Sequence, residues 1–309
     1  MPDGEQIVPF LGNLLFLGKE AIYRRLRGDV VFTFDEVATI SSKLGFSIDR
    51  IAGLKHSERA FFETNLYRAL ASEDAYYNIL QDYVEAFFTL NKSKVVVGHF
   101  VNNHLPYVFS IFLDTLSKFR YYKWMHQSNG FDSSCPMSEI VVPSKILDLQ
   151  KIWMDEASQK KVHSTYIFDN NLFLTICRDV DYFHKNKLVN DVEVQYLQGE
   201  LLSMVDFFEE VARTGEGPSG APLLLYLTPF DLATNYMHFD FDNNSSCQVH
   251  LHSINHLQSF DPHVCDMQKN WINQLKRYSI LITQSSEMQR LAYFNKQREY
   301  ISEIGKIDA

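Results

Sequence analysis

Four basic residues lie close together near the start of the chain, with a spacing suited to phosphate and base contacts. The segment GKEAIYRRLRG, residues 18–28, is predicted to be a short helix ended by glycine. Helical spacing puts Ile22 and Leu26 one turn apart, facing inward. The side chains that project to the opposite side are Glu20, Tyr23, Arg24 and Arg27. Such a face is suited to the major groove of DNA, where arginine and lysine contact phosphates and base edges.

Histidines gather in a second stretch, where five of the eleven lie within residues 238–263. His250 and His252 alternate on a predicted strand, so both imidazoles lie on one face. The predicted hairpin adds His238 across from His250, with Asp240 nearby. Three imidazoles and a carboxylate are a ligand set that zinc accepts. We favour the simpler interpretation of a solvent-facing polar strand, and a metal-dependent enzyme using these histidines is the weaker alternative.

Other motifs of known chemistry are missing from the sequence. It has no nucleophile elbow, no HExxH pair and no Gly-rich phosphate loop with its strand–turn–helix context. Residues 104–125 are rich in aromatic side chains at helical spacing, which suits a ligand pocket, a dimer seam or, as we favour, an ordinary core. We therefore expect neither an enzyme nor a cofactor.

The basic segment is predicted to lie in a set of four short helices within residues 8–54. Pro9 suits the first turn of a helix over 8–16, and Gly18 can cap the next helix over 19–27. Thr33 and Glu36 form a capping-box pattern that opens a third helix, which ends at Gly45. A short fourth helix is expected from Ser47.

The segment KEAIYRRLRGDVVFTFDEVATISSKLGFSIDRI resembles the helix-turn-helix domain of lambda-repressor-like (Xre-like) regulators. More closely, it is similar to a group of poorly characterised bacterial regulators with a YRRLRG recognition helix. The segments LPYVFSIFLDTLSKFRYYKWM and WINQLKRYSILITQSSEMQRLAYFNKQ resemble the long C-terminal region of that group. The resemblance implies that the helix from Lys19 lies in the major groove. The DNA-binding residues it implies are Lys19, Glu20, Tyr23, Arg24, Arg27 and Thr33.

Regulators of this type usually have a scaffold helix before the one at 8–16, and this chain begins too late to supply a full one. We expect either a truncated start or packing against another part of the chain or another subunit. Apolar side chains at Phe10, Leu14 and Phe16 are expected to be exposed and to offer such a contact. A homodimer is also expected because one short helix contacts only a few base pairs.

Beyond residue 57 the pattern changes to longer helices and then to strands. Residues 214–222, rich in glycine and proline, form the clearest linker and a possible sub-boundary. After it, alternation predicts an antiparallel hairpin in which Phe239 pairs with Val249 across a loop over 242–246. Helices are expected at 72–90, 104–125, 144–160, 171–186, 192–213, 262–277 and 286–304, and strands at 95–97, 223–227, 235–241, 247–254 and 278–283.

The predicted fold is therefore mainly α, with a helix-turn-helix bundle over 1–57 and a sensor or dimerisation region over 58–309. That region begins with helices and ends in an α+β part with an antiparallel sheet. The net charge of −9 lies wholly in 58–309, whereas residues 1–57 carry seven basic and seven acidic side chains. A basic patch on an acidic body binds phosphate weakly and with strong salt dependence.

Four cysteines without a CxxC pair indicate free thiols, and no segment is suited to a signal peptide or a membrane span. We expect a cytoplasmic transcriptional regulator that binds double-stranded DNA, with an unknown small-molecule effector as a further candidate partner. The main alternative is a ligand- or protein-binding module with a vestigial helix-turn-helix.

Overall fold

The computed structural model describes residues 6–44, 46, 48, 60, 62–64, 73–127, 132–159 and 161–306. The chain divides into two units, an N-terminal unit over Met1–Phe61 and a C-terminal unit over Phe62–Ala309. This division lies four residues after the boundary expected from the sequence. Each unit is described by itself.

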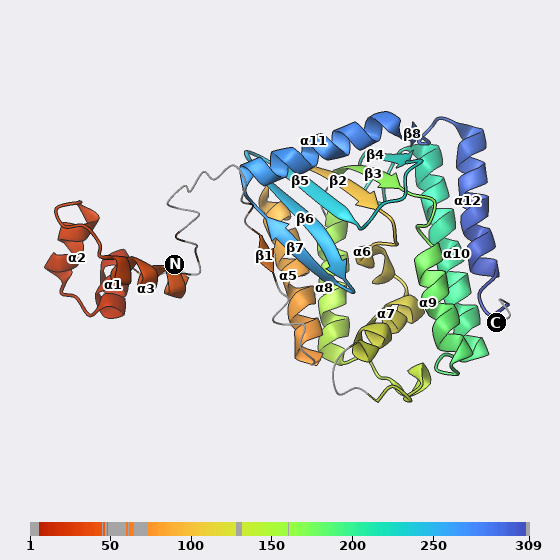
Figure 1. The fold of residues 1–309 in the computed structure, drawn as a ribbon, viewed down its shortest axis with the longest axis horizontal. Helices are drawn as coiled ribbons and strands as arrows, with labels where there is room; N and C mark the ends of the chain where they lie inside the picture. The colour runs from red at the N-terminus through yellow and green to blue at the C-terminus, as the bar shows by residue number, and fades with distance from the viewer. Residues whose placement is uncertain are drawn as a thin grey trace. The chain divides into compact units, whose positions relative to one another are not determined.

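The described part of the N-terminal unit contains three helices (Figure 1), α1 (Ile7–Leu15), α2 (Lys19–Leu26) and α3 (Phe34–Leu44). Their core is formed by Phe10, Leu11 and Ile22, which are at most 9 % exposed. Phe10 was expected to be exposed and is buried, and Leu14 packs against the same cluster. Phe16 is 94 % exposed, as expected. The helix expected from Ser47 lies outside the described residues, apart from Ile48.

Local sequence explains the ends of these helices. Phe16 ends α1 in the left-handed conformation with φ 55°, and Gly28 follows α2 with φ 82°. The capping box before α3 is formed, because the backbone N of Glu36 donates to Thr33 Oγ1 (3.3 Å) and that of Thr33 donates to Glu36 Oε2 (2.9 Å). The predicted starts and ends of these three helices differ from the observed ones by about one residue, which is the usual uncertainty of helix ends.

The C-terminal unit is built on a mixed sheet, whose eight described strands lie in the order β1-β7-β6-β5-β2-β3-β4-β8. Strands β2, β3 and β4 are parallel, and the other pairs are antiparallel. The unit is therefore α+β, with a mixed sheet where an antiparallel one was expected. The strands are β1 (Glu63–Thr64), β2 (Val96–Asn102), β3 (His163–Phe168), β4 (Leu223–Leu227), β5 (Tyr236–Phe241), β6 (Asn244–His252), β7 (Asn255–Ser259) and β8 (Ile280–Leu281).

Helices cover the two faces of the sheet unequally (Figure 1). On one face α11 crosses β5 and β6, and its Ile272 and Leu275 pack against Val101 and Ile167 of the central strands. The other face carries the remaining helices, with α10 on β4 and α5 paired with α8. The helices are α5 (Glu73–Lys92), α6 (Tyr107–Ser110), α7 (Asp114–His126), α8 (Ser144–Gln159), α9 (Leu174–Lys185), α10 (Asp191–Thr214), α11 (Pro262–Tyr278) and α12 (Glu287–Ser302), with the 3-10 turn η2 (Met137–Glu139).

The structure differs from the sequence-based expectation at several places in this unit. The helix expected over 104–125 is broken into α6 and α7, because Glu200 of α10 accepts from the backbone N atoms of Thr115 (2.9 Å) and Leu116 (2.7 Å) and so caps a new helix. Strand β3 was not foreseen, since a short strand buried in the middle of a sheet lacks alternation. The 214–222 segment is a loop inside the unit, closed by a bridge between Glu216 and Pro222.

The hairpin register also differs from the prediction. Tyr236 pairs with Val249 and Phe241 with Asn244, so a tight turn at Asp242 and Asn243 replaces the expected five-residue loop. Asp242 adopts φ 51°, a conformation that aspartate tolerates in such turns. The shift is an odd number of residues, which moves the β6 side chains to the opposite face from the one predicted.

No helix among the described residues is both long and apolar enough to cross a bilayer.

Candidate functional site

The residues that the sequence predicted to contact DNA are exposed on the N-terminal unit. Lys19, Glu20, Tyr23 and Arg24 are exposed on α2, and Arg27 is exposed at its C-cap. Thr33 is exposed just before α3. The helix is held from its inner side by Ile22, which is 0 % exposed. A three-residue turn, Phe16 to Gly18, joins α1 to α2. The structure thus brings five predicted residues onto one helix surface.

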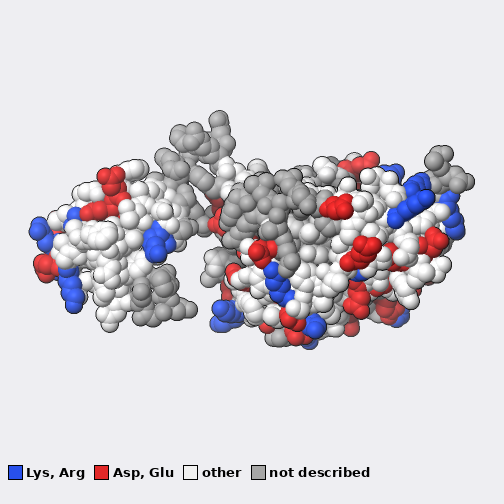
Figure 2. Space-filling view, turned by 90° about the horizontal axis from the view of Figure 1, so that it is seen from below, with Lys and Arg blue, Asp and Glu red and all other residues white. Residues whose placement is uncertain are grey.

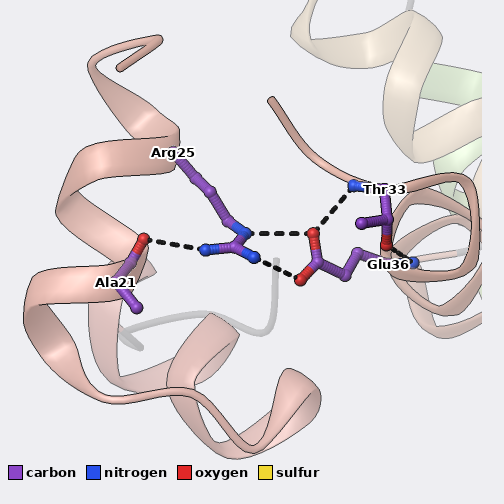
Figure 3. Close-up of polar contacts among 4 residues, drawn as sticks. All are labelled: Ala21, Arg25, Thr33 and Glu36. Atoms are coloured by element: carbon purple, nitrogen blue, oxygen red, sulfur yellow. Dashed lines mark hydrogen bonds and ion pairs between the residues drawn. The ribbon is translucent and has the colours of Figure 1, made fainter. Parts of the chain in front are cut away.

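Arg25 has a different place from its neighbours, because it points inward to α3 (Figure 3). Its Nε donates to Glu36 Oε2 (3.0 Å) and its Nη2 to Glu36 Oε1 (2.7 Å), a bidentate pair. Its Nη1 donates to the carbonyl of Ala21 (3.3 Å). These hydrogen bonds, with that from the Thr33 backbone, hold the pKa of Glu36 below its ordinary value. Leu26, expected to face inward, is instead 47 % exposed.

The remaining cations of α2 differ in whether they are paired. Arg27 forms ion pairs with Asp29 (3.0 Å) and Glu20 (3.5 Å) on the surface. Within the described residues, Lys19 and Arg24 form no ion pair. Basic and acidic side chains accordingly lie side by side on the N-terminal unit (Figure 2). This face can contact an anion, but only Lys19 and Arg24 carry positive charges that no ion pair compensates among the described residues.

The three candidate metal ligands are not brought together. His238 is 0 % exposed and faces α11. It pairs with Cys247 of the neighbouring strand β6. Its ring lies beside that of His99, with 6.0 Å between the ring centroids. His250 lies on the opposite face, because the register differs from the predicted one by an odd number. His252 is exposed near the end of β6. Among the described residues, no group of three or more His, Cys, Asp or Glu side chains could hold a metal, so the weaker alternative of a three-histidine site is not formed there. The favoured interpretation of a solvent-facing strand is wrong for His238, which is buried.

A cavity of about 520 Å³ lies in the C-terminal unit, on the sheet face opposite α11. Its lining combines side chains of β2, β3, β5 and β6 with those of α5, α6, α8 and α10. Val108, Phe109 and Phe112, from the aromatic segment 104–125, contribute to it. The rest of that segment is mainly core, since Leu116, Phe119, Tyr122 and Trp124 are at most 3 % exposed.

Sequence reasoning did not single out the polar groups of this cavity, chiefly Asn102, His104 and Arg120. They are far from His250 in the sequence and lie on different elements, so no spacing connects them. The only sequence signal was the aromatic character of 104–125. No known family model matches the chain, and neither a curated protein nor a solved structure is significantly similar to it.

Proposed function

We propose that this protein is a DNA-binding transcriptional regulator whose N-terminal unit is a helix-turn-helix domain and whose C-terminal unit oligomerises or binds an effector. The observation that carries the proposal is the outer face of α2. It exposes Lys19, Tyr23 and Arg24 on a helix that is fixed from behind by Ile22 and by the Arg25–Glu36 pair. A short helix presented in this way by a preceding helix and turn is the arrangement that places side chains in a major groove.

The roles within this face follow from the contacts of each side chain. Arg24 and Lys19 are free to bind phosphates or guanine edges without breaking an ion pair. Arg27 must exchange its pairs with Glu20 and Asp29 for contacts to DNA, which costs little because both pairs are exposed. Arg25 is expected to support the fold and to make no contact with DNA.

A salt titration on the full chain tests the proposal. Affinity for a labelled random-sequence duplex is expected to fall steeply as salt rises from about 50 to about 200 mM. Arg24→Ala and Arg27→Ala should each weaken binding and reduce the magnitude of the logarithmic salt slope by about one. Arg178→Ala, which removes an exposed arginine on α9 of the C-terminal unit, is the matched control and should change neither. Absent binding, or binding without a salt slope, would contradict DNA recognition.

A second candidate is a protein-binding N-terminal unit, favoured by its exposed apolar side chains. Phe16, Val31 and Phe34 are 94 %, 82 % and 76 % exposed. A second copy of the chain covering them would also supply the dimer that two DNA half-sites require. If Phe34→Ser converts a dimer to a monomer in sedimentation and also weakens DNA binding, the two functions are linked. Loss of the dimer with unchanged DNA affinity would favour the protein-binding role alone.

A further inference from the structure

The cavity of the C-terminal unit has the size and lining of a small-molecule site. Its volume of about 520 Å³ falls within the range of protein cavities that hold drug-sized ligands. Aromatic rings form much of its wall, with Phe100 stacked on Tyr166 at 4.4 Å between centroids and Phe109 tilted against Tyr166 at 5.8 Å. Such a wall favours a ligand with an apolar or aromatic body.

Arg120 of α7 also lines this cavity, and its guanidinium forms no ion pair among the described residues. Nη2 of Arg120 donates to the carbonyl of Leu105 (2.6 Å), whereas its Nε has no hydrogen-bond partner. No carboxylate of the described residues forms an ion pair with it, and the nearby Asp179 is paired with Lys123. Burial lowers the pKa of Arg120 more than Asp179 raises it. A positive charge in such surroundings is costly unless an anion compensates it.

The histidines next to Arg120 add no positive charge of their own that would compete with Arg120 for an anion. Burial lowers the pKa of His104 to about 3 and also lowers that of His250. The two rings meet edge to face with centroids 4.6 Å apart. His104 Nδ1 is 2.5 Å from Asn103 Oδ1, and His250 Nε2 is 2.6 Å from the carbonyl of Ser253. Both imidazoles are neutral at physiological pH, and the cluster carries the single charge of Arg120.

Two further polar atoms in the lining are unsatisfied. Asn102 Oδ1 and Trp153 Nε1 have no hydrogen-bond partner among the described residues, although these residues are only 1 % and 2 % exposed. Buried polar groups are nearly always paired, so each exception needs an explanation. With Arg120 Nε, three unsatisfied atoms belong to residues that line this cavity.

We propose that this cavity binds a monocarboxylic acid with an apolar body, its carboxylate paired with Arg120. A planar carboxylate matches the guanidinium fork, and its single negative charge balances the single positive one. A phosphate group, with a charge near −2, would leave excess negative charge in the apolar cavity. The site does not depend on DNA binding; only its use as an effector site rests on the proposed function.

Calorimetric titration of the full chain without DNA tests the site. Decanoate and naphthoate are the probes, with decanol and naphthol as their neutral partners of similar shape. At least one acid should bind at least about tenfold more tightly than its neutral partner, as expected when a charge-assisted pair is formed. The acid that binds better shows whether the natural ligand is aliphatic or aromatic. Equal affinity for acid and neutral partner, or no binding of either acid, would overturn the proposal.

Variants locate the carboxylate. Arg120→Met should abolish the preference for the acid, whereas Arg178→Met, an exposed arginine outside the cavity, should keep it. If circular dichroism shows that Arg120→Met is unfolded, Arg120→Lys takes its place. Lysine retains the charge but not the fork, so acid affinity should fall while the preference over the neutral partner persists. Unchanged acid affinity in a folded Arg120 variant would refute the assignment. Because DNA is absent, failure here is distinct from failure of the DNA-binding proposal.

Discussion

At the scale of the residue, three arginines close together at the end of α2, Arg24, Arg25 and Arg27, have three different environments. Arg24 is exposed and has no ion pair among the described residues, Arg27 is paired on the surface, and Arg25 is locked to Glu36. Their types and spacing in the sequence do not distinguish them, because helical geometry leaves both Arg25 and Leu26 next to the inner face. Arg25 is the one whose partner, Glu36, lies half-buried on α3, and it therefore supports the fold.

The Arg25–Glu36 pair should make the N-terminal unit sensitive to acid. The pKa of Glu36 in the folded chain lies below its ordinary value of 4.5, so the unfolded chain binds the proton first. The stabilisation is therefore complete above that value and is lost as pH falls through the folded-state pKa. Hydrogen exchange of α2 and α3, measured from about pH 6 to about pH 3, should accelerate locally, after correction for intrinsic rates.

Glu36→Gln provides the comparison for this prediction, since it keeps an oxygen acceptor for Thr33 but lacks the charge. The variant should be less protected at neutral pH and should lose the acid-dependent part of the exchange. The same pH profile in variant and parent would show that the pair does not set the acid response.

At the scale of the element, local signals placed most helices well, and long-range contacts decided the exceptions. The capping box of α3 and the glycine after α2 are visible in the sequence because both act within a few residues. The start of α7 is not visible, because its cap is supplied by Glu200 from another helix. The hairpin register likewise depended on a turn at Asp242 that alternation alone could not fix.

Removing the cap on α7 should destabilise the C-terminal unit. Glu200→Ala leaves the backbone N atoms of Thr115 and Leu116 without their acceptor, at a cost of about 1–2 kcal/mol in the free energy of unfolding. Urea unfolding followed by circular dichroism measures the loss. Glu210→Ala on the same helix removes only an exposed pair with Arg213 and should change little. Equal effects of the two substitutions would argue against the cap.

At the scale of the whole molecule, several histidines of the C-terminal unit are wholly or partly buried in or beside the sheet. Burial lowers the pKa of His99 to about 4, of His104 to about 3 and of His256 to about 4, from an ordinary value of 6.5. As pH falls below 6.5, the histidines of the unfolded chain take up protons and those of the folded chain do not, so the free energy of unfolding decreases. This loss continues until pH reaches the folded-state values.

Between pH 7 and about 5.5, each of these histidines should cost about 1 kcal/mol of the free energy of unfolding. Urea unfolding of the full chain at the two pH values measures the sum. His99→Asn removes one titrating group and should reduce the pH dependence by about that amount. A pH dependence that is the same in the variant would contradict a neutral, half-buried His99.

By itself, the sequence determined the three described helices of the N-terminal unit, the exposed basic face of α2, and most helices and strands beyond it. These depend on periodicity and on caps that act over a few residues. Tertiary structure alone decided that Arg25 turns inward, that the parallel strands β2, β3 and β4 lie in the sheet, and that His238 and His250 lie on opposite faces. It also brought Arg120 into one cavity with His250, because register and sheet order depend on contacts between distant segments that no local spacing records.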